Sequence, residues 1–234
     1  MTDEEFKKKL KELKIELTKE AQDKLNKFYK MLVEKNKVMN LTAITAKEEV
    51  NLKHFYDSLT LVKVIDLNKE LTLCDVGTGA GFPGIVLKIV FPQLKIVLID
   101  SLNKRIEFLN EVIEKLDLKD IKAVHDRVEV YSKNNIEKFD IVTSRAVAKT
   151  NILLEMSSQL VKVDGKIILL KAECKEEIKK SLNAIKELNL SLEKEEEFTL
   201  PIENSKRTIV VFNKKRATNK KYPREFAKIR KRPL

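Results

Sequence analysis

Four of the five glycines in this 234-residue chain lie within eight positions, between Gly77 and Gly84. Glycine adopts positive φ angles without strain and lets another group approach the backbone closely, so the chain gathers its backbone freedom here. One apolar stretch, Leu71–Val76, precedes the glycines, and another, Ile85–Val90, follows them. A strand, a glycine turn and a helix in this order typically hold a ligand against backbone N–H groups at the start of the helix. We therefore expect a small-molecule site at this turn.

The glycines allow two registers of cofactor binding. Gly79, Gly81 and Gly84 fit the Gly-x-Gly-x-x-Gly pattern of dinucleotide sites. Asp100, which ends the next predicted strand, would bind the ribose in either register. The second register, Asp-x-Gly-x-Gly-x-Gly, begins at Asp75 and resembles motif I of the Rossmann-like S-adenosylmethionine (SAM) methyltransferases.

The residues around the glycines favour SAM over a dinucleotide. A carboxylate such as Asp75 is unfavourable beside a pyrophosphate but tolerable beside the ammonium or sulfonium group of SAM. Pro83 also removes an N–H group that a phosphate would use. A purely structural turn is the weaker alternative, because three alternating glycines serve no packing purpose.

From residue 71 onward, short apolar runs alternate with amphipathic stretches. Strands are expected at residues 71–76, 95–100, 121–125, 139–144, 166–171, 191–200 and 206–213, and helices at residues 82–91, 102–116, 152–161 and 173–188. This alternation predicts a parallel, doubly wound sheet, and the short turn before the last strand predicts an antiparallel edge. The expected fold class is α/β: a Rossmann-like class I SAM-dependent methyltransferase, with a mostly parallel seven-stranded sheet and an N-terminal helical extension.

The first 66 residues contain no glycine or proline, and their apolar side chains recur at helical spacing. Thr18 is expected to cap the second helix, and Thr45 with Glu48 to form a capping box at the start of the next one. We divide the chain into an N-terminal helical extension (1–66), a SAM-binding methyltransferase domain (67–213) and a basic C-terminal tail (214–234).

The net charge of +11 is concentrated at the C-terminus. Residues 213–234 contain ten basic residues and one acidic residue, a net +9, so the rest of the chain contributes only +2. Tyr222 and Phe226 are interleaved with this charge, and cations with aromatic rings suit phosphates and bases. The pattern favours nucleic acid over a merely solubilising tail. An anionic membrane is disfavoured because the segment has no continuous apolar face.

The composition predicts a cytoplasmic protein. The chain has no apolar run of about 18 residues, and its N-terminus is charged almost at once. The two cysteines, Cys74 and Cys174, are too few for a disulfide framework, and no Cys/His cluster has the spacing of zinc ligands. We therefore expect neither a metal nor a membrane partner, and a monomer, since no oligomerisation signal stands out.

An ordered set of short motifs resembles the bacterial RsmG family, also called the GidB or glucose-inhibited division protein B family. The motifs run from about residue 36 to the C-terminus: Asn40-Leu41-Thr42-Ala43-Ile44, His54 with Asp57-Ser58, Asp75 to Ile85, Asp100 to Arg105, Ser144-Arg145-Ala146 and Tyr222-Pro223-Arg224. The resemblance implies SAM-dependent methylation of guanine N7 in the 530 loop of 16S ribosomal RNA, with that RNA or the small ribosomal subunit as partner. The chain departs from the family pattern at Lys53, Ala172 and Ala227, which leaves the glycine motif untouched.

The resemblance also assigns roles to residues. The expected cofactor-binding residues are Gly77, Gly79, Gly81, Phe82, Asp100, Val128, Glu129 and Arg145. The expected catalytic residues are Arg145, His54 and Asp57, and the expected RNA-binding residues are Lys171, Arg207, Lys220, Lys221, Tyr222 and Arg224. Spacing alone places His54, Asp57 and Ser58 on one helix face, which also fits an ordinary surface network. Lys171 fits a surface lysine with a buried stem equally well.

The chemistry of guanine N7 agrees with what the sequence lacks. N7 has a free lone pair, so methyl transfer needs alignment of the reactants and no general base. An Asn-Pro-Pro-Tyr type segment, as in many exocyclic-amine methyltransferases, is missing after the fourth strand, where Ser144 and Arg145 stand instead. Two alternatives stay open: a nicotinamide-dependent oxidoreductase, and a non-catalytic RNA-binding assembly protein with a degenerate cofactor fold.

Overall fold

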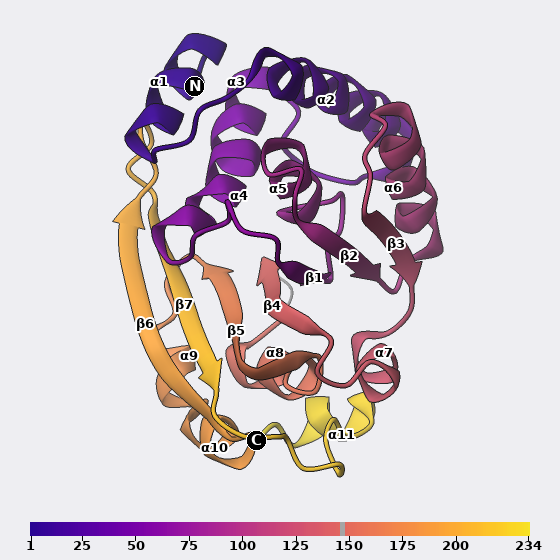
Figure 1. Ribbon diagram of the computed structural model, residues 1–234, viewed down its shortest axis with the longest axis vertical. Helices are drawn as coiled ribbons and strands as arrows, with labels where there is room; N and C mark the ends of the chain where they lie inside the picture. Colours follow the sequence, from indigo (N-terminus) through magenta and orange to yellow (C-terminus); the bar gives the residue numbers. More distant parts are fainter. Residues whose placement is uncertain (146–147) are drawn as a thin grey trace.

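A seven-stranded sheet forms the centre of the computed structural model, which describes residues 1–145 and 148–234 (Figure 1). The strand order is β3-β2-β1-β4-β5-β7-β6. The strands are β1 (Thr72–Val76), β2 (Lys95–Asp100), β3 (Ile121–His125), β4 (Phe139–Arg145), β5 (Val161–Lys171), β6 (Leu190–Thr199) and β7 (Lys206–Lys214). Strands β1 to β5 pair in parallel, and β7 pairs antiparallel with both β5 and β6. The predicted fold class and antiparallel edge are confirmed.

Hydrophobic clusters cover both faces of the central strands. Because successive side chains of a strand point to opposite sides, neighbouring residues pack into different clusters. Leu73 and its register partner Ile141 pack into one hydrophobic cluster. The next pair, Cys74 and Val142, packs into the other. Covered faces on both sides explain why the strands read as nearly continuous apolar runs.

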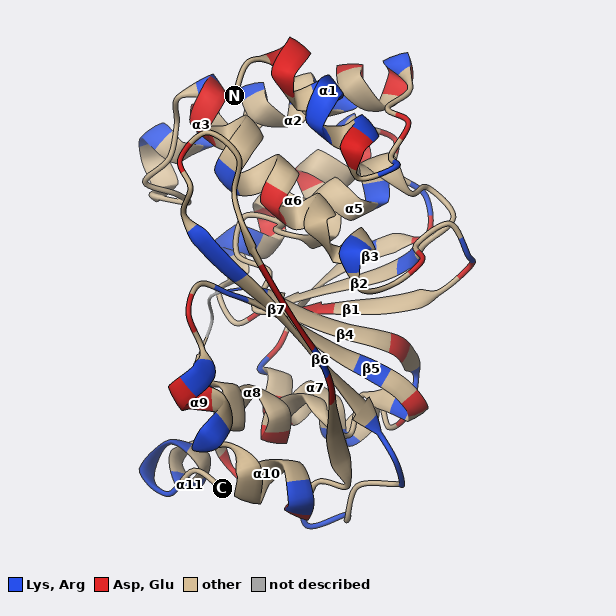
Figure 2. Cartoon of the chain, turned by 90° about the vertical axis from the view of Figure 1, so that its left-hand side faces the viewer, with Lys and Arg blue, Asp and Glu red and all other residues tan. Residues whose placement is uncertain are grey.

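One layer of helices includes the N-terminal extension (Figure 2). It contains α1 (Asp3–Glu12), α2 (Lys19–Met39), α3 (Lys47–Val50), a π-helix (Asn51–Tyr56), α4 (Asp57–Leu59), a 3₁₀ turn (Thr60–Lys63), α5 (Gly84–Val90) and α6 (Asn103–Lys115). Phe28 and Leu32 of α2 share one core with Ile85 of α5 and Leu109 of α6. The extension is therefore packed into the same core as the sheet.

The opposite layer contains the later helices: α7 (Val128–Asn134), α8 (Thr150–Ser157), α9 (Lys175–Lys179), α10 (Leu182–Glu187) and α11 (Phe226–Lys231). Two of these, α7 and α11, were not expected, and the helix expected at 173–188 is divided in two at Ser181. The other expected helices and strands are present: β2 and β3 have the expected ends, and the ends of the others are shifted.

Of the two helix caps predicted from the sequence, one is confirmed and one is wrong. Thr18 caps α2 by accepting a hydrogen bond from the N–H group of Ala21. The capping box at Thr45 and Glu48 is wrong, because α3 begins after Ala46, which has no side-chain cap. The backbone of this short helix instead continues directly into the π-helix.

The basic segment after β7 is packed against the protein body. Lys214 still belongs to β7 and is fully buried, where its ammonium donates hydrogen bonds to the carbonyls of Ser158 and Val161. Farther on, the guanidinium of Arg224 forms a two-pronged ion pair with the buried carboxylate of Glu155, with donor–acceptor distances of 2.8 and 2.6 Å. These contacts fix the segment on the protein body. Within the described residues, no helix is both long and apolar enough to cross a membrane.

Candidate active site

A cavity of about 530 Å³ lies at the carboxyl ends of β1, β2 and β4. This edge of a parallel sheet is the usual ligand site of doubly wound folds. The cavity is lined by the glycine turn, by charged residues at or after the ends of β2, β3 and β4, and by residues of the N-terminal and C-terminal segments: Leu41, Thr42, His54, Gly77, Thr78, Gly79, Ala80, Phe82, Asp100, Ser101, Arg105, Asp126, Arg127, Val128, Glu129, Arg145, Met156 and Phe226. Almost every residue expected to bind the cofactor lies on its wall, and Gly81 lies within the same turn.

The glycines of the turn serve different purposes. Gly77, Gly79 and Gly81 have φ angles of +67°, +60° and +100°, which L-residues with side chains rarely adopt. A Cβ atom at Gly79 would meet nothing within 4 Å, so any side chain there would project into open space at the cavity. A Cβ atom at Gly84 would lie 2.2 Å from Leu98 Cδ2, so this glycine permits close packing of α5 on β2.

The turn has few free donors to offer a phosphate. The N–H groups of Gly77 and Thr78 donate to the carbonyl of Ile99, and those of Gly81 and Phe82 donate to the carbonyl of Thr78. The N–H group of Gly84, at the start of α5, donates to Asp75 Oδ2 at 2.9 Å. A dinucleotide pyrophosphate needs these N–H groups. The turn is therefore built for a ligand that is not an anion at this point.

Asp75 is a buried acid near the end of β1, just before the turn. Its Oδ2 atom also accepts a hydrogen bond from the Thr78 hydroxyl at 2.7 Å, whereas Oδ1 has no partner. Burial raises the pKa of this carboxyl to about 6, against the hydrogen bonds from Thr78 and Gly84. Asp75 therefore braces the turn against α5 and does not line the cavity.

Asp100 does line the cavity, at the end of β2. Its carboxylate accepts hydrogen bonds from the N–H groups of Gly79 and Leu102, each at 3.0 Å, and pairs with Arg105 at 3.1 Å. These contacts fix the carboxylate and leave it lone pairs for hydroxyl groups of a ligand. A ribose matches this acceptor.

The opposite end of the cavity is formed by the start of α7 and by α11. Val128 and Glu129 lie there as expected, next to Asp126 and Arg127. Arg127 pairs with Glu129, and its guanidinium carbon lies 4.7 Å from the ring centroid of Phe226. The combination of apolar surface and polar edges suits a purine.

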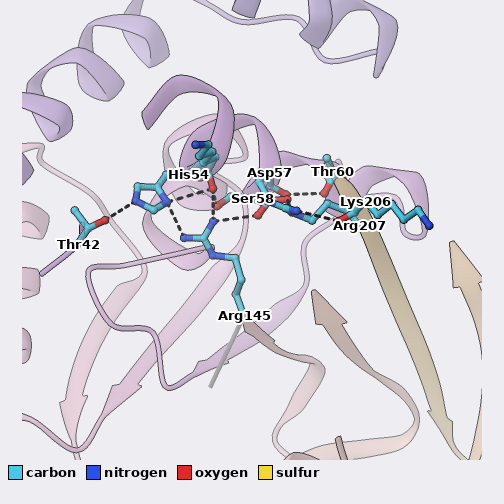
Figure 3. Close-up of polar contacts among 9 residues, drawn as sticks. Thr42, His54, Asp57, Ser58, Thr60, Arg145, Lys206 and Arg207 are labelled. Atoms are coloured by element: carbon cyan, nitrogen blue, oxygen red, sulfur yellow. Dashed lines mark hydrogen bonds and ion pairs between the residues drawn. The ribbon is translucent and has the colours of Figure 1, made fainter. Parts of the chain in front are cut away.

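Arg145 joins His54 and Asp57 into one network at the end of β4 (Figure 3). Its Nη1 atom donates to the Lys53 carbonyl at 2.8 Å and to Asp57 Oδ2 at 3.2 Å. Its Nη2 atom lies 3.1 Å from His54 Nδ1, and its guanidinium stacks 4.9 Å from the ring centroid of Phe82. Arg145 is thus held on several sides while it faces the cavity.

His54 is a neutral member of this network. An arginine can only donate, so His54 Nδ1 must accept from Arg145, and the ring proton then lies on Nε2, 2.9 Å from the Thr42 hydroxyl. Burial, together with the charge of Arg145, lowers the pKa of His54 to about 3. His54 is therefore a poor proton acceptor and a good positioning group.

A π-helix, Asn51–Tyr56, carries His54 and the Lys53 carbonyl that Arg145 contacts. Such helices are rare and concentrate at functional sites. The sequence predicts His54, Asp57 and Ser58 on one face, but Ser58 instead donates its hydroxyl proton to the His54 carbonyl. Only His54 and Asp57 join the Arg145 network.

The residues expected to bind RNA are in different environments. Lys220 and Lys221 are exposed on the segment between β7 and α11, where Figure 2 shows basic residues along the chain. Arg207 is half-buried and contacts Asp57 Oδ1 at 3.2 Å. The other three are held internally: Lys171 pairs with Glu177, Tyr222 is buried with its hydroxyl donating to Glu187, and Arg224 pairs with Glu155. These three interactions are structural in this conformation, and the Tyr222 ring has no free face on which a base could stack.

Several lining residues have no assignment from the sequence. Thr42 lies in a motif shared with the family, but its contact with His54 requires the fold. Arg105 and Arg127 follow β2 and β3, and their positions after predicted strands are the signal that could have identified them. Ala146 of the Ser144-Arg145-Ala146 motif lies outside the described residues. Across residues 1–145 and 148–234, the His, Cys, Asp and Glu side chains form no group of three that could hold a metal ion.

Comparisons with known proteins agree with this geometry. The family model described as rRNA small subunit methyltransferase G matches residues 21–210. A relative named ribosomal RNA small subunit methyltransferase G from Oceanobacillus iheyensis is 47% identical, with 100% of both chains covered, and one from Staphylococcus epidermidis is 45% identical, with 100% of this chain and 99% of the relative covered. A SAM-dependent methyltransferase structure from Aquifex aeolicus, 17% identical, has a TM-score of 0.53 over 72% of this chain and 94% of that one, which shows a shared fold. The chain therefore belongs to the rRNA small subunit methyltransferase G family.

Proposed function

We propose that this protein transfers a methyl group from SAM to N7 of a guanine in the 530 loop of 16S ribosomal RNA. The proposal is carried by three features that meet at one cavity. The N–H groups of the glycine turn bond within the protein, the carboxylate of Asp100 is positioned to accept hydrogen bonds from a ribose, and Arg145 is held in place by the Lys53 carbonyl. The family to which the chain belongs supports the RNA substrate.

The residues present fit SAM. The space beside Gly79 and the cavity of about 530 Å³ accommodate a ligand of this size. Gly77, Gly79, Gly81 and Phe82 would border its methionine part, Asp100 its ribose hydroxyls, and Val128 with Glu129 its adenine. When bound, SAM supplies an electrophilic methyl group attached to a positively charged sulfur.

The network around Arg145 would hold the substrate in line rather than remove a proton. Guanine N7 needs no deprotonation, and His54, with its pKa of about 3, stays neutral at physiological pH. Asp57 and the Lys53 carbonyl fix the guanidinium, and Phe82 lies beneath it. Catalysis would then come from orientation of the reacting atoms.

RNA would approach this edge over Arg207, which reaches the Asp57 side of the network. Lys220 and Lys221 lie on the exposed segment after β7, nearer the opposite edge of the sheet, where they would contact a more distant part of the RNA. Phosphate contacts from such residues give affinity without sequence information. The methyl acceptor would be chosen at the cavity itself.

The cofactor assignment is tested by calorimetry with SAM and NADH. We expect SAM to bind and NADH not to bind. Affinity for SAM should fall progressively in Gly79→Ala and Gly79→Val, because the added atoms fill the space the ligand needs. Ala217→Val, on the exposed segment after β7, serves as control. Unchanged SAM affinity in Gly79→Val would refute the proposed site.

The two alternative functions predict different results in the same assay. An oxidoreductase would bind NADH, but the Gly84 N–H group at the start of α5 already donates to Asp75. A non-catalytic assembly protein would bind RNA without transferring a methyl group from SAM. The intact turn and the positioned Asp100 favour the enzyme.

A further inference from the structure

We propose that Phe226, at the start of the C-terminal helix α11, is a positioning residue that forms the outer wall of the adenine end of the cofactor cavity. This inference rests on the proposed function, because it assumes that SAM occupies the cavity. It gives the C-terminal segment, otherwise expected to bind only RNA, a direct part in holding the cofactor.

The position of the ring carries the inference. Phe226 lines the same cavity as Val128 and Glu129, although almost a hundred residues separate them in sequence. The ring is half-buried, and Arg127 stacks on it with its guanidinium carbon 4.7 Å from the ring centroid. Glu129 in turn pairs with Arg127. Phe226 thus belongs to the cluster that closes this end of the cavity.

Contacts on both sides of Phe226 in sequence hold α11 in place. Before it, Arg224 binds the buried carboxylate of Glu155 through its side chain at 2.8 and 2.6 Å and through its backbone N–H at 3.0 Å. After it, Ile229 is fully buried in the cluster beneath the sheet. The ring is therefore presented by an anchored element.

Phe226 also separates the cofactor cavity from a second one. This second cavity, of about 730 Å³, lies between α7 and α11 and is lined by cations including Lys133, Arg230 and Lys231. Phe226, Arg127 and Glu129 line both cavities. Removal of the ring would join them and expose the adenine end to water, with loss of apolar contact to a purine.

Phe226→Ala tests the inference, with Phe198→Ala as matched control. Phe198 on β6 is also half-buried beneath a cation, since the ammonium of Lys63 lies 5.2 Å from its ring centroid, but it lines neither of these two cavities. The probes are SAM, S-adenosylhomocysteine and uncharged adenosine, measured by calorimetry. Loss of the apolar contact between this side chain and the adenine predicts a loss of about tenfold in affinity in Phe226→Ala.

We expect the same fold-loss for all three ligands, because they share the adenine, and no loss in Phe198→Ala. At saturating SAM, kcat should be unchanged while KM for SAM rises. Phe226→Leu, which keeps an apolar side chain on α11, should lose less affinity. Equal affinities in wild type and Phe226→Ala would overturn the inference alone. Failure of the wild-type protein to bind SAM would overturn the proposed function as well.

Discussion

Asp75 shows how one residue of the glycine motif sets the identity of the ligand. The sequence presents it as an acid that a pyrophosphate would avoid, whereas the structure shows that it occupies the donors a pyrophosphate would need. Its carboxyl is fully buried with one oxygen unpartnered. Burial disfavours the charged carboxylate, and the hydrogen bonds to Oδ2 offset this cost only in part. The pKa of Asp75 is therefore raised.

The pKa of Asp75 predicts a pH-dependent difference between the wild type and Asp75→Asn. The folded pKa of about 6 lies above the ordinary aspartate pKa of 3.8, so the folded state binds the proton more tightly than the unfolded chain does. The stability this gives is present below the unfolded pKa and is lost as pH rises through about 6. Denaturant unfolding of both proteins should show the wild type losing at most about 3 kcal/mol relative to the variant over this window. A pH-independent difference would contradict the account.

His54 predicts the pH profile of methyl transfer. Its pKa of about 3 leaves it neutral throughout the working range. Because the unfolded histidine takes up a proton near pH 6.5, the folded state loses stability only as pH falls below that value. Single-turnover rates should show no base limb between about pH 7 and about pH 9. His54→Ala should lower the rate without changing the shape of the profile. A rate that rises tenfold per pH unit and loses that rise in His54→Ala would indicate proton removal and a target other than N7.

Sequence reasoning located the residues of this site better than their interactions. The glycine pattern, Asp100 and the residues after β3 follow from position relative to strands, which local sequence predicts. The contacts of Arg145 with His54 and Asp57 join residues about 90 positions apart, and no local pattern encodes them. The burial of Tyr222 was unpredictable for the same reason.

At the scale of elements, the anchoring of the C-terminal segment carries the main prediction. Arg224→Ala would leave the fully buried carboxylate of Glu155 without its cationic partner, and loss of one partner of a buried pair costs about 3–5 kcal/mol. Arg230→Ala, at an exposed position on the following helix α11, should cost less than about 0.5 kcal/mol. Urea unfolding measures both variants, and equal stabilities would show that the ion pair does not hold the segment.

The elements that sequence reasoning missed are the short ones. α7 and α11 contain seven and six residues, too few for an apolar period to stand out. The charge of residues 213–234 predicted a nucleic-acid contact and gave no sign that Ile229 and Tyr222 pack into the core. The central strands were found because both faces of the sheet are covered there, which gives strands such as β1 and β2 a nearly continuous apolar run.

At the scale of the whole molecule, charge on the exposed part of the C-terminal segment should govern RNA affinity. Alanine substitution of Lys215, Arg216, Lys220 and Lys221 removes four exposed cations without disturbing Lys214 or Arg224. The slope of log affinity against log salt should then fall by about 3. Matched substitution of the exposed residues Lys7, Lys8, Lys11 and Lys14, in and after α1 at the opposite end of the molecule, should change it less. Equal slopes for the two variants would show that the segment does not contact RNA.

The central claim, methylation of guanine N7 in 16S ribosomal RNA, is tested most directly by mass spectrometry of nucleosides. Unmodified 16S RNA, free and in small subunits, is incubated with the protein and methyl-deuterated SAM, then digested. We expect deuterated 7-methylguanosine in a nuclease fragment that contains the 530 loop, and a much smaller yield with Arg145→Ala, whose substrate alignment is lost. Label in another nucleoside or another fragment, or no label in either substrate, would contradict the account.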